Sequence, residues 1–187
     1  MKLLFIGLLL VGAAFAQPES YLAAGQLEVR GLFGAFGASR LSPHPAYGGE
    51  LAYALKDWFA LTGAYIYNSL LSVSSDSCTN GVCAHAAGKA GIKEMTAGVR
   101  FTMPGRIAAY GAASAGKASL ASSIAASSGP FSFSSSAAIP YMAVEGGGGV
   151  DFSLSRSWGL AVDARVVKAN GLTPYVRLAG GVYFRFQ

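Results

Sequence analysis

Two cysteines near the middle of the chain carry thiols that could form a disulfide or hold a metal ion. Cys78 and Cys83 are the only cysteines, and Asn80-Gly81 between them favours a tight turn. A metal site built from the two thiolates and the nearby His85 lacks a clear fourth ligand. An oxidising compartment would favour the disulfide, so the choice depends on whether the chain is exported.

A second set of side chains has the types that nucleophilic catalysis uses. His44 and His85 are the only histidines, and Asp76 and Ser77 lie shortly before His85. A serine nucleophile needs a histidine within hydrogen-bond reach, and spacing along the chain does not establish that geometry. The glycine run 146–149 lacks the lysine and the following helix of a phosphate-binding loop. We expect no enzymatic activity, cofactor or metal, and keep His44 and Ser77 as the alternative catalytic pair.

The N-terminal segment has the features of an export signal. Lys2 supplies a positive start, residues 3–11 form an apolar core, and Ala14-Phe15-Ala16 is a small-x-small cleavage site. The apolar run is shorter than the roughly 20 residues that a membrane-spanning helix needs. We expect residues 1–16 to be removed by cleavage between Ala16 and Gln17. The exported chain would then form a disulfide between its two cysteines.

Composition narrows the class of the remaining chain. Of the 187 residues 52% are apolar and 12% are charged, and the formal net charge is +5. This composition excludes a disordered chain, and the lack of a basic cluster argues against nucleic-acid binding. No apolar run after residue 16 is long enough for a transmembrane helix. A β-sandwich, a soluble barrel and a membrane β-barrel are the classes that fit.

Side chains that alternate with a period of two predict strands along most of the chain. We expect eight strands, at 26–39, 48–56, 58–68, 93–103, 106–116, 139–154, 158–168 and 174–186. The phase of the strand at 106–116 stays open, because Ile107 and Tyr110 favour opposite faces. Elsewhere one face is apolar, aromatic or glycine. The other face mixes small residues with Glu28, Arg30, Glu50, Glu94, Arg100, Glu145, Asp151, Asp163, Arg165, Arg177 and Arg185.

The bulk of the two faces decides which of them points inward. An eight-stranded barrel has an interior just wide enough for side chains to fill, so small residues and a few charges suit it. The bulky apolar face must point outward into lipid. We therefore predict an eight-stranded antiparallel up-and-down transmembrane β-barrel over 26–187, after a short lead at 17–25. Its lumen charges would pair and plug the barrel, with a small or gated pore as the alternative.

Short and long connections alternate along the chain, as in barrels with short periplasmic turns and longer external loops. We expect the two longest connections, 69–92 and 117–138, to be external loops; the second is rich in Ser and Ala, which is typical of a flexible loop. An aromatic girdle is expected beside the short turns, from Trp58, Phe59, Phe152 and Trp158.

Two segments resemble the small outer-membrane β-barrel family, which includes OmpA-like transmembrane domains and eight-stranded OmpX-like barrels. Residues 148–165 are similar to a hairpin common in that family. The C-terminal segment with Gly181, Phe184 and Phe186 is similar to the sorting signal read by the barrel-assembly machinery, although Gln187 follows the last aromatic. The His, Asp and Ser residues of the expected external loops also resemble the set found in barrel-type lipid A palmitoyltransferases.

The resemblance implies a place in the outer membrane of a Gram-negative-type cell, with outer-membrane lipid and the barrel-assembly machinery as partners. We expect a structural or surface-interaction role, in which 69–92 and 117–138 form the contact surface for an extracellular partner that the sequence does not identify. A channel and a lipid A-modifying enzyme are the alternatives.

Overall fold

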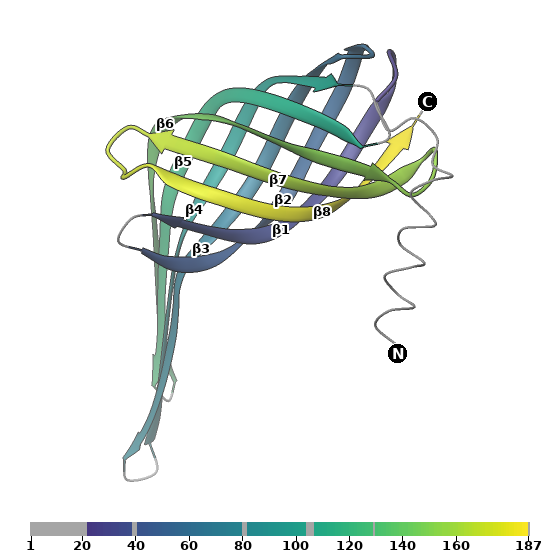
Figure 1. The fold of residues 1–187 in the computed structure, drawn as a ribbon. Coiled ribbons are helices and arrows are strands. Elements are labelled where there is room, and N and C mark those ends of the chain that lie inside the picture. The colour runs from purple at the N-terminus through teal and green to yellow at the C-terminus, as the bar shows by residue number, and fades with distance from the viewer. Residues whose placement is uncertain (1–21, 39–40, 80–81, 104–106, 129, 187) are drawn as a thin grey trace.

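Eight strands form one closed antiparallel barrel in the computed structural model, which describes residues 22–38, 41–79, 82–103, 107–128 and 130–186. Each strand pairs with the next, and the last pairs with the first (Figure 1). The predicted fold class is therefore confirmed. The strands are β1 (Leu27–Ala38), β2 (Leu41–Lys56), β3 (Phe59–Thr79), β4 (Val82–Met103), β5 (Ala108–Ser128), β6 (Phe131–Ser153), β7 (Trp158–Ala169) and β8 (Tyr175–Phe186).

The wall of the barrel is built by strict alternation of side chains. In β7, Trp158, Leu160 and Val162 are exposed on the outside, while the residues between them are buried. The open question of phase in β5 is settled in the same way, because Tyr110 is buried and Ile107 is exposed. Alanine is frequent inside because eight strands leave little room there: Ala46, Ala52, Ala54, Ala60, Ala108, Ala112, Ala118, Ala143, Ala161, Ala169 and Ala179.

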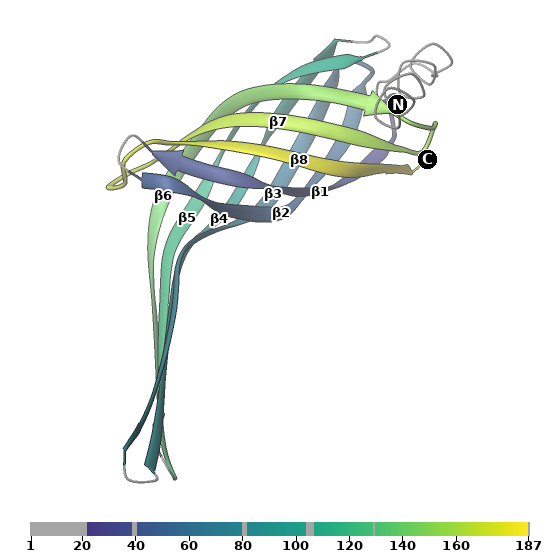
Figure 2. The ribbon, with the colours of Figure 1, turned by 60° about the horizontal axis from the view of Figure 1, so that its bottom comes forward.

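Within the segments predicted as external loops, 69–92 and 117–138, residues 69–79, 82–92, 117–128 and 131–138 are strands, so the prediction of loops was wrong. β3, β4, β5 and β6 continue past the barrel and pair with one another in that order. The resulting four-stranded sheet leaves the rim at the end of the barrel opposite to the end of β8 (Figures 1 and 2). We call this sheet the arm, defined as residues 69–79, 82–92, 117–128 and 131–142.

Pairing inside the barrel explains why small residues form strands in the arm. β4, β5 and β6 leave the barrel already in register, so each further residue adds backbone hydrogen bonds without a new loop to close. The ladder between β3 and β4 continues after a bulge between Ser69 and Leu71. At about 3.3 Å per residue, the arm extends roughly 35–40 Å beyond the rim.

β2 begins at Leu41, earlier than the predicted start at residue 48. Its first residues pair with the end of β1, where His44 lies opposite Phe36 and Pro45 opposite Ala35. The ladder between β2 and β3 starts only at Ala46, so the preceding residues form an open edge. Proline lacks an N–H donor and is tolerated on such an edge.

The end of the predicted lead packs against the inside of the wall at the end with the short turns. Leu22 packs against Ala52, Ala54 and Ala60 inside the wall. The amide of Ala24 donates to the carboxylate of Asp57 at 2.8 Å and holds the lead in place. The predicted signal peptide and its cleavage site between Ala16 and Gln17 lie outside the described residues. Within the described residues, no helix has the length and apolar character to cross a membrane.

Amide hydrogen exchange on the full chain in detergent micelles tests the arm. β4 and β5 have a paired neighbour on each side, so amides at 84–92 and 119–127 should exchange more than about tenfold slower than unpaired amides. In the arm, β3 and β6 each have one free edge, so alternate amides at 69–79 and 131–142 should exchange fast. Uniformly fast exchange through the arm would show that these segments are loops.

Candidate functional site

Charged side chains fill the interior of the barrel. Six carboxylates and five guanidinium groups lie there, and none is more than 8% exposed: Glu28, Arg30, Glu50, Glu94, Arg100, Glu145, Asp151, Asp163, Arg165, Arg177 and Arg185. They project from six of the eight strands, and β3 and β5 contribute neutral polar groups instead. A buried charge is costly unless it is paired, so the positions of these groups must match across the lumen.

Eight of the charged groups form a chain of alternating sign along the lumen. Every member contacts a group of opposite charge on at least one side, and the chain runs from the short-turn end to the rim. With N···O distances, the contacts are Arg185 to Glu28 (2.9 Å), Glu28 to Arg100 (2.8 Å), Arg100 to Glu50 (3.6 Å), Glu50 to Arg165 (2.5 Å), Arg165 to Glu145 (3.0 Å), Glu145 to Arg177 (2.9 Å) and Arg177 to Glu94.

Neutral polar side chains complete the network. The Tyr110 hydroxyl accepts a hydrogen bond from Arg30 at 2.6 Å and donates one to Asp163 at 2.8 Å. The hydroxyl of Tyr175 donates to Glu94, and Tyr183 shares a hydrogen bond with a serine hydroxyl of β6. Sequence reasoning missed these tyrosines. The sequence of β8 contains a signal for two of them, because Tyr175 and Tyr183 alternate onto the same face as the buried Arg177 and Arg185.

Apolar clusters lie at both ends of the charged network. At the rim, Phe36, Ile92, Val167 and Tyr175 pack together among small residues. At the short-turn end, Leu22 packs with three alanines of β2 and β3 on the opposite side of the charged network. The described structure therefore holds its charged network between two apolar layers, which raises the strength of each ion pair by keeping water away.

Aromatic side chains mark both ends of the wall on the outside. At the short-turn end Trp58 stacks on Phe101, with 6.0 Å between ring centroids, and contacts Phe59 at 5.7 Å. Trp158, Phe184 and Phe186 are exposed on the same side of the wall, whereas Phe152 is half-buried and lies opposite Leu160. Gly181 faces inward, against Leu32. At the rim, the exposed Tyr47 lies 5.3 Å from the half-buried Tyr67.

The arm has two faces of different chemistry, because residues directly opposite in neighbouring strands project from the same face. The inner face continues the lumen side of the wall and exposes Leu71, Val73, Ile124, Phe131, Phe133 and Ile139. The outer face continues the lipid side and carries Ser72, Ser74, Asp76, His85, Lys89, Ser123, Ser127, Ser132, Ser134 and Ser136. Polarity is thus reversed relative to the barrel, where the bulky apolar residues point outward.

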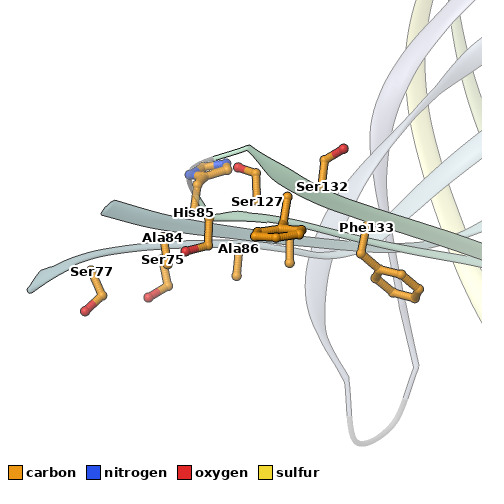
Figure 3. A pocket seen from close by; sticks show the side chains of 11 residues that line it. Ser75, Ser77, Ala84, His85, Ala86, Ser127, Ser132 and Phe133 are labelled. Atoms are coloured by element: carbon orange, nitrogen blue, oxygen red, sulfur yellow. The ribbon is translucent and has the colours of Figure 1, made fainter. Parts of the chain in front are cut away.

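An open pocket lies near the tip of the inner face. Its volume is about 380 Å³, and Phe131 and Phe133 line it beside Ala86, Ala126 and Ser75. The side chains of Phe133 and Ser75 lie on the side of the sheet opposite to His85, Ser127 and Ser132 (Figure 3). Residues of both faces line the pocket, and its large apolar side chains, Phe131 and Phe133, belong to the inner face.

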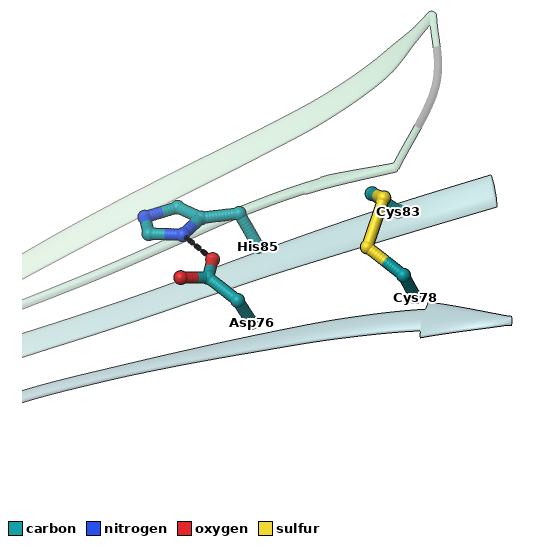
Figure 4. The surroundings of a disulfide bond; sticks show 4 residues. All are labelled: Asp76, Cys78, Cys83 and His85. Atoms are coloured by element: carbon teal, nitrogen blue, oxygen red, sulfur yellow. Dashed lines mark hydrogen bonds and ion pairs between the residues drawn. A yellow bond between two sulfur atoms is a disulfide. The ribbon is translucent and has the colours of Figure 1, made fainter. Parts of the chain in front are cut away.

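The histidines lie in two separate places. His85 is hydrogen-bonded to Asp76 on the outer face of the arm, in one row with Ser127 (Figure 4). His44 packs against Phe36 at the barrel rim, with 5.9 Å between ring centroids, and Ser77 projects from the inner face of the arm. The structure does not bring His44 and Ser77 together. Among the described residues, no three His, Cys, Asp or Glu side chains are grouped to hold a metal ion.

The predicted disulfide is confirmed. Cys78 and Cys83 lie directly opposite each other at the end of the β3–β4 hairpin, with 4.1 Å between their Cα atoms (Figure 4). The bond ties together the two strands at the point farthest from the barrel, where sheet pairing is weakest.

Replacing Glu28 tests the contribution of the network to stability. Glu28 contacts Arg30, Arg100 and Arg185, so Glu28→Gln leaves three buried guanidinium groups without this shared charge. The free energy of unfolding in lipid vesicles, measured with urea, should fall by about 3–5 kcal/mol. Asp76→Asn removes a carboxylate from an exposed pair and should cost less than about 1 kcal/mol. Similar losses in both variants would contradict the role of the lumen network.

Comparison with known proteins identifies the architecture. No family model and no curated protein matches the sequence. The N-terminal β-barrel domain of Pseudomonas aeruginosa OprF is 14% identical, with a TM-score of 0.53 over 88% of this chain and 100% of that domain. Ail, the attachment invasion locus protein of Yersinia pestis, was solved with the heparin analogue sucrose octasulfate; it is 13% identical, with a TM-score of 0.53 over 91% of this chain and 99% of Ail.

Neisserial surface protein A is also 13% identical, with a TM-score of 0.50 over 91% of this chain and 100% of that protein. Identities this low carry information on architecture and none on activity. These proteins are eight-stranded outer-membrane barrels, as this chain is an eight-stranded closed barrel. This chain therefore has the fold of the small eight-stranded outer-membrane β-barrels.

Proposed function

We propose that this protein is a closed, non-enzymatic barrel of the outer membrane that presents the arm as a contact surface outside the cell. The observation that best supports this proposal is the contrast between a lumen filled by paired charges and an arm that exposes large apolar side chains. Outer-membrane lipid surrounds the wall. The barrel-assembly machinery reads the last strand, where Phe184 and Phe186 face outward at the end of the chain's described part.

The packing of the lumen supports a plug and disfavours the pore alternative. A conducting pore needs a continuous path of water, and here the ion-pair chain lies between the Leu22 cluster and the Phe36 cluster. Moving a guanidinium aside would leave a carboxylate buried without its partner, which is costly in an interior of low dielectric. The charges therefore serve to hold the eight strands in one register.

The arm supports a role in surface interaction. Exposed apolar patches of this kind mark sites of protein–protein or membrane contact. A paired sheet also holds its side chains in place before binding, so less conformational entropy is lost than with a loop. Two of the proteins with this fold have names that refer to attachment or to a surface: Ail, the attachment invasion locus protein, and Neisserial surface protein A.

The exposed position of the Asp76–His85 pair supports a non-enzymatic role. Both side chains are more than half exposed, and among the described residues Asp76 is the sole hydrogen-bond partner of His85. Catalysis by a serine nucleophile needs a histidine bonded to the hydroxyl and donors for the oxyanion in a site that excludes water. The open outer face of the arm has neither arrangement.

Planar-bilayer recordings test the closed lumen. Wild-type protein should give no unitary current steps above the bare bilayer, because no continuous path of water crosses the network. Arg100→Ala removes the link between Glu28 and Glu50 in the middle of the lumen and should introduce brief openings. Arg156→Ala, at an exposed turn, removes the same charge and should stay silent. Steady steps from the wild type would favour the pore alternative.

Cell adhesion tests the contact surface. Cells that produce the protein should be retained on octyl-agarose beads more than on plain agarose. The double variant Phe131→Ser/Phe133→Ser removes two exposed rings from the inner face and should lower retention about tenfold. The matched control Ser132→Ala/Ser134→Ala alters the outer face of the same strand and should retain adhesion. Equal retention of both variants, each still resistant to SDS before boiling, would overturn the proposed surface.

A further inference from the structure

Four lysines lie on the outside of the wall where the barrel meets the arm, and no carboxylate of the described chain pairs with them. Lys89, Lys93, Lys117 and Lys168 are exposed and project from the outer face of β4, β5 and β7. The described carboxylates lie elsewhere: six fill the lumen, Asp57 holds the lead at the opposite end, and Asp76 pairs with His85. This rim is therefore a band of cations whose counter-ions must come from outside the described chain.

Two of these lysines border a groove with a volume of about 440 Å³. Lys93 lies opposite Tyr67 in one row, and Lys89 lies opposite Ser123 two rows farther along the arm. In the row between them the small residues Ala121 and Ala138 line the groove, whereas the ring of Tyr67 covers Gly91. Ser123 and Ser136, which share the row of Lys89, add hydroxyl groups to the lining.

The shape of the groove depends on a close contact between Tyr67 and Gly91. A Cβ atom added to Gly91 would lie 2.6 Å from Cζ of Tyr67, so the ring covers the glycine directly. Any larger residue at this position would push the ring away from the sheet. The ring therefore lies over the glycine between the two lysines of β4 and lines the groove beside Ala121 and Ala138.

The groove lies at the level where lipid headgroups meet the wall. The row directly below it contains Tyr65 and Met95 of the barrel wall together with Lys117 and Met142 at the base of the arm, and both methionines are exposed on the outside. Tyr67 itself belongs to the aromatic residues at the rim, and such residues mark the headgroup level of a membrane. Above the groove the outer face carries serines in place of bulky apolar residues.

We propose that this groove binds the phosphate group of a membrane lipid whose acyl chains lie against the wall below. Lysine ammonium groups supply point charges for the phosphate, and the serine hydroxyls supply hydrogen-bond donors. A free phosphate ion would use the lysines alone, whereas a lipid also uses the apolar surface around Met95 and Met142. The inference goes beyond the proposed surface role and does not depend on it, because it needs only a barrel in a membrane.

Electron paramagnetic resonance of spin-labelled lipids tests the proposal on the full chain in phosphatidylcholine vesicles. Wild-type protein should associate with spin-labelled phosphatidic acid about tenfold more strongly than with spin-labelled phosphatidylcholine, given the contribution of each lysine near a membrane surface. The double variant Lys89→Ala/Lys93→Ala should lose most of that preference. Both lysines are exposed, so the variant should still fold, which resistance to SDS before boiling checks.

A matched control separates the groove from general attraction of anions. Lys56→Ala/Arg156→Ala removes two exposed cations near the opposite end of the barrel and should keep the preference. An equal loss in both double variants would overturn the groove as a site. A spin-labelled fatty acid that binds as strongly as phosphatidic acid would show that charge alone is recognised. Loss of the preference in excess inorganic phosphate would assign the groove to the free anion instead of a lipid.

Discussion

A carboxylate inside the lumen needs a cation within a few ångströms, and the register of the whole barrel must meet that need. Glu28 on β1 reaches Arg100 on β4 and Arg185 on β8, while Glu50 on β2 reaches Arg165 on β7. These contacts cross the lumen as well as joining neighbours. A slip of one residue in any of these strands would turn its charge toward lipid, so pairing, tilt and closure depend on one another.

The same period-two rule has opposite consequences above and below the rim. Inside the membrane, lipid contacts the outer face, so bulky residues point outward and small or charged residues point inward. Along the arm the order changes: serines and lysines take the outer face, and phenylalanines and branched residues take the inner face. Four continuous strands therefore carry two different surfaces, and their mutual pairing shifts register in the β3–β4 ladder at the bulge between Ser69 and Leu71.

Alternation in the sequence was enough to predict the wall, because bulky and small residues on opposite faces leave a clear pattern in β7 and β8. It was not enough for the arm, where Ser and Ala occupy both faces in much of β5 and leave little contrast to detect. Those residues form strands because the adjacent barrel segments are already paired. That pairing involves distant parts of the chain, so the local sequence does not reveal it. Individual ion pairs also escaped prediction, since the partner of Glu50 lies 115 residues away and is chosen by the stagger of the strands.

The disulfide between Cys78 and Cys83 gives the two hairpins of the arm different covalent topologies. A protease that cuts the backbone once between these cysteines produces two pieces that are still linked by a bond, so the nicked molecule separates only after reduction. A single cut at the tip of the β5–β6 hairpin meets no such bond and leaves fragments joined by strand pairing alone. One tip of the arm thus tolerates cleavage without loss of covalent integrity, whereas the other relies on the barrel to keep its halves together.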